Sequence, residues 1–195
     1  MANFQPRVII GRWRQGYALD LHTLSSVFIG NNEFGHPEFE TTRSEIGELL
    51  FKLKNRADTS TVNEIVAAVA ELMGEWKPEL DVIVPVPPST LRVVQPVLLL
   101  AEAIGTELGI SVANCVRRLH EIAQLKNVYD LDKRLELLSG LHEVEESATR
   151  QKRVLLFDDL YRSGATMNAI AIELYDRGKA SDVLALTITR TRSNQ

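Results

Sequence analysis

Two adjacent carboxylates, Asp158 and Asp159, stand just before a short loop of small and hydroxyl-bearing residues in the run VLLFDDLYRSGAT. The backbone N–H groups of such a loop suit a phosphate, and the hydroxyls of Ser163 and Thr166 add donors. Gly164 lets the backbone approach a ligand closely. The carboxylates upstream can accept hydrogen bonds from sugar hydroxyls or hold a hydrated divalent ion. The stretch therefore predicts a site for a pentose 5-phosphate.

Each piece of this pattern also has an ordinary structural explanation. Two aspartates at a strand end are common, and a Ser-Gly-x-Thr loop before a helix can serve only as its cap. The order and the tight spacing of the pieces favour a binding site instead. An apolar strand leads into two carboxylates, and after two further residues a small loop opens a helix.

The elements that must position this loop alternate between strand and helix patterns. Apolar, β-branched runs predict strands at residues 81–86, 112–116, 154–157 and 182–189. Apolar residues at helical spacing predict helices at residues 43–55, 61–76, 96–108 and 166–177, the second with a capping box of Thr61 and Glu64. This alternation indicates an α/β fold with a parallel sheet, in which ligands bind at the carboxyl ends of the strands.

The N-terminal region differs from the rest of the chain in being rich in aromatic residues and glycines. Residues 8–14 and 17–23 have the pattern of short strands, with a turn expected at Gln15 and Gly16. We therefore divide the chain into a β-rich N-terminal cap of residues 1–41 and an α/β domain of residues 42–195.

Composition narrows the function classes without naming one. With 22 basic and 26 acidic side chains the net charge is −4, which argues against a general binder of nucleic acids or anionic membranes. An anionic small molecule needs only local positive groups. Cys115 is the single cysteine, so we expect no internal disulfide and no CxxC zinc ribbon. A reducing, cytoplasmic compartment is therefore expected. No apolar run has the length of a membrane span, and the four histidines have no metal-motif spacing, so we expect no tightly bound metal.

The run VLLFDDLYRSGAT resembles the signature of the type I phosphoribosyltransferases, an apolar strand followed by D-D-x-x-[ST]-[ST]-G-x-T. The upstream run DVIVPVPPS and the strand at 182–190 resemble the ComF-like branch of that family, and the resemblance covers roughly residues 42–192. It implies a type I phosphoribosyltransferase-like parallel sheet flanked by helices, with a small β-rich hood. It also implies Mg²⁺-assisted transfer of the 5-phosphoribosyl group from phosphoribosyl pyrophosphate (PRPP) to a nitrogenous acceptor, with release of pyrophosphate.

The resemblance gives each matching residue a role. Asp158 and Asp159 would be the catalytic pair that holds the ribose hydroxyls and the Mg²⁺ brought by PRPP. The 5-phosphate would bind the loop of Arg162, Ser163, Gly164, Ala165 and Thr166. The pyrophosphate would bind Ser89, Arg92 and Lys54. A flexible loop over residues 117–134 would close on the reaction with Arg118 and Lys126. A plain surface loop is the alternative for the segment around Lys126.

Two departures from the family pattern concern the loop and the N-terminus. Arg162 stands where the signature has a hydroxyl residue, and it can either pair with the phosphate or point away. ComF-like proteins usually carry a cysteine zinc ribbon at the N-terminus, which this chain has no cysteines to build, so the β-rich cap would take its place. In that cap Trp13, Tyr17 and His22 either stack on and orient the acceptor or form a local small core.

Two other functions fit the same loop. The domain could bind PRPP or a nucleotide without catalysis, as a sensor or partner-binding module, or it could bind phosphosugars in general without Mg²⁺. An enzyme would release pyrophosphate when given its acceptor, whereas a sensor would not. The resemblance is compatible with a homodimer, and we expect no nucleic-acid or membrane partner.

Overall fold

The computed structural model of the chain describes residues 2–88, 93–119 and 140–192. Its centre is a five-stranded sheet in the order β1-β2-β9-β8-β5. These strands are β1 (Arg7–Val8), β2 (Gln15–Leu21), β5 (Val82–Pro85), β8 (Arg153–Tyr161) and β9 (Asp182–Arg190). Strands β2, β9, β8 and β5 are parallel, and β1 is antiparallel at one edge. The predicted α/β class with a mainly parallel sheet is confirmed.

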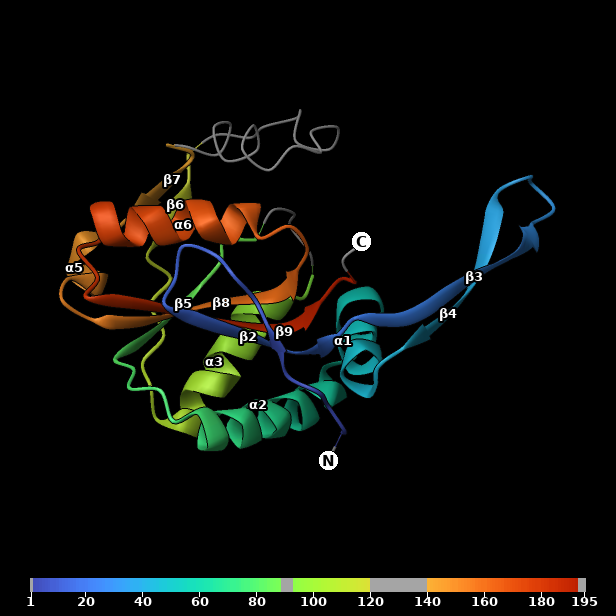
Figure 1. Cartoon of the computed structure of the whole chain (residues 1–195), viewed down its shortest axis with the longest axis horizontal. Coiled ribbons are helices and arrows are strands. Elements are labelled where there is room, and N and C mark those ends of the chain that lie inside the picture. The colour runs from blue at the N-terminus through green and yellow to red at the C-terminus, as the bar shows by residue number, and fades with distance from the viewer. Residues whose placement is uncertain (1, 89–92, 120–139, 193–195) are drawn as a thin grey trace.

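Helices cover both faces of this sheet (Figure 1). They are α1 (Glu45–Arg56), α2 (Val62–Trp76), α3 (Pro96–Leu108), the short α5 (Glu146–Thr149) and α6 (Ala165–Asp176), with a 3₁₀ turn at Thr59–Thr61. Helices α1, α2 and α3 pack on one face, where Leu155 and Phe157 of β8 are buried. Helix α6 packs on the other face against Val154 and Leu156. The alternation of side chains along β8 therefore serves two separate cores. No helix within the described residues is long and apolar enough to cross a bilayer.

Helix α1 begins and ends where its sequence favours a boundary. The Ser44 hydroxyl caps its N-terminus by accepting a hydrogen bond from Gly47 N at 2.9 Å. Its last turn carries Lys54 and Arg56, whose charges suit the negative end of the helix dipole. The capping box predicted for α2 is wrong, because the Thr61 hydroxyl donates to the carbonyl of Asp58 instead of accepting from the helix.

Three strand predictions need correction. Gln15 and Gly16 form no turn and are the first residues of β2, because Gln15 pairs with Leu184. The segment 112–116 is no continuous strand: Val112 makes an isolated bridge to Ile83, and β6 (Val116–Arg118) pairs with β7 (His142–Val144) in a separate ribbon. Strand β8 runs past the predicted end at residue 157 to Tyr161, because its pairing with β9 continues that far.

The region assigned to the cap contributes both to the sheet and to a separate hairpin. Strands β1 and β2 belong to the central sheet, and Ala18 and Leu19 of β2 are fully buried on its two faces. Strands β3 (Thr23–Asn31) and β4 (Pro37–Arg43) form a two-stranded hairpin that extends away from the body (Figure 1). The sequence pattern detected the β-rich character but not which strands pair with the distant strand β9.

Candidate functional site

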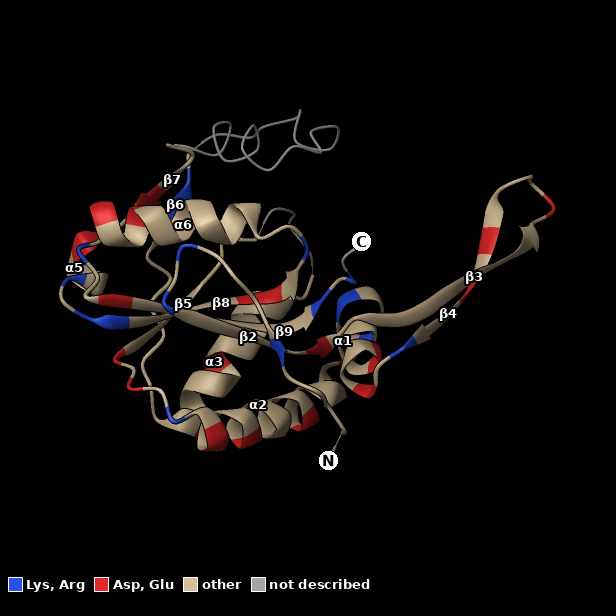
Figure 2. Ribbon diagram, viewed as in Figure 1, with Lys and Arg blue, Asp and Glu red and all other residues tan. Residues whose placement is uncertain are grey.

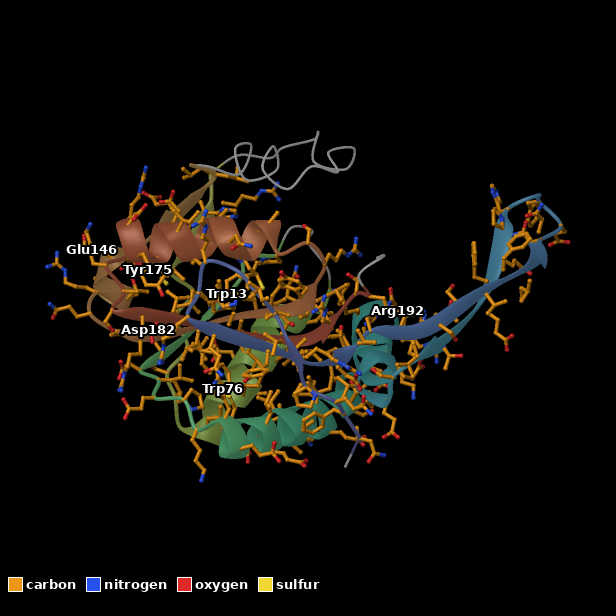
Figure 3. All side chains as sticks on the ribbon, in the orientation of Figure 1. Trp13, Trp76, Glu146, Tyr175, Asp182 and Arg192 are labelled. Carbon is orange, nitrogen blue, oxygen red and sulfur yellow. The ribbon has the colours of Figure 1, made fainter. Side chains whose placement is uncertain are left out.

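The candidate residues gather at the carboxyl edge of the parallel sheet. Strand register places Asp158 of β8 beside Thr187 of β9, and Asp20 of β2 beside Thr189. In Figure 3 Asp182 marks the start of β9 and Arg192 lies two residues past its end, and the candidate edge is the one near Arg192. This is the edge at which open α/β sheets bind ligands.

The two aspartates lie within β8, not in the loop after it. Because side chains alternate along a strand, they point to opposite faces of the sheet. Asp159 follows Leu155 and Phe157 on the face of α1 and is buried, whereas the half-buried Asp158 lies on the face of α6. Asp158 Oδ1 accepts a hydrogen bond from the Asp159 backbone N–H at 2.8 Å. The pair therefore reaches to both sides of the strand end.

Lys54 contacts Asp159 from the last turn of α1. Its ammonium group lies 2.8 Å from each carboxylate oxygen, and both side chains are largely shielded from solvent. Charge-assisted hydrogen bonds of this length are stronger than neutral ones. The structure thus brings Lys54, expected beside a pyrophosphate, into direct contact with the aspartate pair.

The carboxyl group of Asp158 has an unusual environment. Withdrawal from solvent and the neighbouring charge of Asp159 raise its pKa to about 7, against the weaker opposing effects of its hydrogen bond and of Lys54. Thr187 stands beside it in the register, and its fully buried hydroxyl has no hydrogen-bond partner within the described part of the chain. The site can therefore present either a neutral or an ionised carboxyl near neutral pH.

The loop from Arg162 to Thr166 leads directly into α6. Arg162 and Ser163 are exposed, and Gly164 has a φ of 72° in the left-handed region. No side chain caps α6, and Ala165 N makes only a long hydrogen bond, of 3.5 Å, to the Ser163 hydroxyl. Since the first N–H groups of a helix have no intrahelical acceptor, this loop presents donors and a positive dipole end toward the sheet edge.

Two residues that the sequence analysis missed hold this loop in place. Asn168, one turn into α6, donates from Nδ2 to the Gly164 carbonyl at 2.9 Å and accepts from Arg12 N at 2.6 Å. The Tyr161 hydroxyl donates to the Ile10 carbonyl at 3.1 Å, and its ring packs edge-on against Trp13. A buried asparagine four residues after the loop glycine was the available signal for Asn168.

His22 lies at the same edge, directly after β2. Its backbone N–H donates to the Arg190 carbonyl at 2.8 Å, and Nδ1 lies 3.1 Å from the Thr189 hydroxyl. Partial burial lowers its pKa, and so do the positive charges of Arg43, Lys54 and Arg162, while Asp159 opposes them. A neutral imidazole therefore stands among the charged groups of the site.

The other aromatic candidates of the cap pack locally. Trp13 is buried and donates from Nε1 to the Ile9 carbonyl at 3.0 Å. Tyr17 packs edge-on against Trp76 of α2, with ring centroids 5.0 Å apart, near the amino end of β2. Figure 3 shows Trp13 and Trp76 in different layers of the molecule. Trp13 and Tyr17 thus form parts of the two cores, and of the three candidates His22 is the one at the sheet edge.

The remaining predicted residues lie apart or outside the described residues. Arg118 ends β6, in register with His142, in the ribbon beside α6. Ser89, Arg92 and Lys126 lie outside the described residues. Lys54 also lines an open pocket of about 320 Å³ with its helix neighbours 53–57 and with Val93 and Val94. Lys54 therefore contacts Asp159, and the end of its helix lines a pocket next to the segment predicted to bind pyrophosphate.

Comparisons with known proteins bear on the fold of the chain. No family model matches the chain. The chain is 27% identical over 150 residues, 74% of its length, to competence protein ComFC of Bacillus subtilis, and the match spans 59% of ComFC. Adenine phosphoribosyl transferase from Trypanosoma brucei, solved with AMP, pyrophosphate and ribose-5-phosphate, superimposes with a TM-score of 0.52, covering 96% of this chain and 75% of that one at 13% identity. Adenine phosphoribosyltransferase from Saccharomyces cerevisiae gives 0.50, with 86% and 84% covered, also at 13% identity.

The chain has a type I phosphoribosyltransferase fold, and its sequence is similar to that of a ComF protein. The resemblance of its run VLLFDDLYRSGAT to that family is thereby supported by an independent comparison of whole structures. At 13% identity the solved structures establish the fold of this ComF-like protein and leave its activity to be argued from the site.

Proposed function

We propose that this ComF-like protein is a PRPP-dependent phosphoribosyltransferase that transfers the 5-phosphoribosyl group to a nitrogenous acceptor and releases pyrophosphate. The observation that carries the proposal is the arrangement at the end of β8. Asp158 and Asp159 lie in the last residues of β8 and point to its two faces, the Gly164 loop follows at the N-terminus of α6, and Lys54 contacts Asp159. An adenine phosphoribosyl transferase of the same fold holds AMP, pyrophosphate and ribose-5-phosphate, which supports a site for the same chemical groups here.

The 5-phosphate would bind the loop of residues 162–166. The N-terminal N–H groups of α6 suit its charge, and the exposed Arg162 and Ser163 can add donors from the open side. Asn168 and Tyr161 would act as positioning residues, because they fix the loop backbone without needing to contact the ligand.

The ribose hydroxyls would donate to the carboxylates of Asp158 and Asp159. Lys54 would lie between the ribose and the pyrophosphate, since it contacts Asp159 and borders the pocket beside Val93 and Val94. Ser89 and Arg92, expected at the pyrophosphate, lie outside the described residues and remain part of the proposal.

The donor set at this edge fits Mg²⁺ that arrives with the substrate. The described residues contain no group of three or more His, Cys, Asp or Glu side chains that could hold a metal alone. Mg²⁺ usually takes one or two carboxylates together with substrate phosphates, and Asp158 and Asp159 supply that number. When bound, Mg²⁺ would neutralise charge on the pyrophosphate.

The protein's own contribution to the reaction would be positional and electrostatic. The acceptor nitrogen forms a bond to the anomeric carbon of the ribose as the bond to pyrophosphate breaks, and positive charge develops on the ring. Asp158 and Asp159 would hold the ribose and stabilise that charge, while Lys54 would stabilise the departing anion. His22, whose Nδ1 lies beside the Thr189 hydroxyl, would orient the acceptor.

Binding and turnover of PRPP test this proposal separately. Calorimetry with PRPP and Mg²⁺ should show binding to the wild type and none to the double variant Asp158→Asn, Asp159→Asn. The exposed Asp176→Asn is the matched control and should bind as the wild type does. A screen of purine, pyrimidine and amine acceptors, with pyrophosphate as the readout, should then find turnover. Unchanged PRPP affinity in the double variant would overturn the site.

A second candidate function is a PRPP- or nucleotide-binding sensor without catalysis. Two observations favour it: the curated relative is named a competence protein, and Lys54 already engages one of the two carboxylates. A sensor would bind PRPP and release no pyrophosphate with any acceptor in the screen. A general phosphosugar binder would instead take ribose 5-phosphate as tightly as PRPP, without Mg²⁺.

A further inference from the structure

The hairpin β3–β4, called the arm below (residues 23–43), lies outside both cores of the protein. It is a sheet of two strands that extends beyond the helices (Figure 1). Its base is tied to the body where Arg192 Nη1 donates to the Leu24 carbonyl at 2.8 Å. An isolated two-stranded hairpin is at best marginally stable in water, and three or more strands are needed for independent stability. The outer part of the arm therefore lacks a partner that its own architecture requires.

Exposed large apolar side chains are concentrated in the arm. Six of its side chains are between 45% and 76% exposed: Leu24, Val27, Phe28, Ile29, Phe34 and Phe39. Phe28 and Phe39 pack edge-on across the two strands, with centroids 5.7 Å apart, and still remain more than half exposed. Exposed apolar side chains gathered on one small element are typical of an interaction surface.

The two edges of the arm differ in how they resist pairing. Strand β4 carries Pro37, Glu38 and Glu40, and proline and charged side chains are the usual means by which edge strands avoid new partners. Strand β3, TLSSVFIGN, holds no proline and no charged residue over its nine positions, and it is uncoloured along its length in Figure 2. The edge of β3 is thus open to strand addition, and the edge of β4 is defended.

We propose that β3 pairs antiparallel with β3 of a second copy of this chain, which makes a four-stranded sheet in the order β4-β3-β3-β4. Charge selects this arrangement. Pairing of two β4 strands would bring Glu38 and Glu40 of one copy against those of the other, whereas pairing of two β3 strands opposes no charges. The acidic strands then lie at the outer edges of the new sheet. Such a contact is self-complementary, as a two-fold dimer requires.

Oligomeric mass tests the pairing directly. Light scattering of the full chain over a dilution series should give twice the chain mass of 21.8 kDa. Val27→Lys places a charge at the centre of β3 and should halve that mass. Because Val27 is 58% exposed and stands opposite Glu40, the new lysine can pair with Glu40 and leave the hairpin intact. Glu40→Lys, on the defended strand of the same arm, should leave the dimer unchanged.

A cross-link locates the contact. In a Cys115→Ala background, Val27→Cys should form a disulfide-linked dimer under mild oxidation, whereas Glu40→Cys should stay monomeric on a non-reducing gel. A monomer throughout the dilution series would overturn the proposal. So would a dimer that survives Val27→Lys, or one that cross-links equally through Glu40→Cys, since either result places the contact elsewhere.

Discussion

The ammonium group of Lys54 lies 2.8 Å from both carboxylate oxygens of Asp159, although the two residues are 105 positions apart in the sequence. The pair connects the last turn of α1 to the end of β8, on the face opposite α6. Only 20% of the Lys54 side chain and 11% of the Asp159 side chain are exposed. Two charges in such a place must balance each other, so the end of α1 and the candidate site depend on one another.

Removal of the lysine charge should destabilise the fold. Lys54→Met keeps the aliphatic stem but leaves Asp159 partly buried beside Asp158 without its cation. Loss of one partner of a shielded ion pair, discounted for the remaining exposure, should cost about 1–3 kcal/mol. Urea unfolding measures this cost. Lys52→Met, on the same helix and outside this pair, is the control and should change the unfolding free energy little. Equal stability of the two variants would contradict the role given to the pair.

The same variant should raise the pKa of Asp158 further. Lys54 opposes the combined effects of burial and of Asp159 on that carboxyl, so its removal leaves the neutral form more favoured. Under the proposed function, PRPP binding to Lys54→Met should weaken and its pH dependence should move to higher pH. Calorimetric titrations at several pH values measure both effects, and an unchanged profile would contradict the coupling.

The raised pKa of Asp158 predicts a fall in stability as pH rises from about 4 to about 7. The folded protein keeps the proton over this window, in which the unfolded chain, with a pKa near 4, has lost it. The contribution of protonated Asp158 to stability is thus complete below the pKa of this residue in the unfolded chain. It disappears as pH rises through its pKa in the folded protein. Urea unfolding of the wild type and of Asp158→Asn at several pH values isolates this contribution. A difference between them that stays constant with pH would disprove it.

His142 should act in the opposite direction. Burial lowers its pKa to about 4, helped by the charge of Arg118, and its buried Nδ1 has no hydrogen-bond partner within the described residues. The unfolded chain binds a proton at this residue near pH 6.5 and the folded chain does not, so stability falls as pH drops from about 6.5 to about 4. Unfolding of His142→Phe should lack this dependence. The exposed His36→Phe should retain it, and a matching loss in that control would contradict the assignment.

Local pattern predicted the parts of the site that are contiguous in the sequence. The strand at residue 154, the Gly164 loop and the helix after it all follow from composition and spacing, because each depends on neighbours a few residues away. The family resemblance suggested Lys54 as a contact of pyrophosphate, but it did not indicate the contact of Lys54 with Asp159. Strand length was underestimated, since pairing of Tyr161 with Arg190, not apolar character, decides where β8 ends.

Contacts between distant segments could not be predicted in this way. Strand β2 joins the sheet beside β9, with Gln15 opposite Leu184, and no local signal specifies that partner. The bonds from Tyr161 to Ile10 and from Asn168 to Arg12 likewise depend on the path of the segment between β1 and β2. For the bond between Asn168 and Arg12, the one hint in the sequence was a polar residue within an otherwise apolar helix face.

Gly164→Ala should weaken both the fold and the loop. Gly164 has a φ of 72°, and an added Cβ would lie 2.6 Å from the ring and the hydroxyl of Tyr161. That ring cannot easily give way, because its hydroxyl is bonded to Ile10 and its edge packs on Trp13. Gly109, which ends α3 with a φ of 67° and has open space around it, is the matched control for the backbone strain alone.

The two alanine variants should therefore differ by the cost of the clash. We expect about 1 kcal/mol for Gly109→Ala from the left-handed φ. For Gly164→Ala we expect about 2–4 kcal/mol, because overpacking adds to the strain. Urea unfolding measures both values. In a Tyr161→Ala background, which has no ring to clash with, Gly164→Ala should cost no more unfolding free energy than Gly109→Ala does. Equal costs for the two glycines, or an undiminished cost of Gly164→Ala in the Tyr161→Ala background, would show that Tyr161 does not hold the loop in the conformation described.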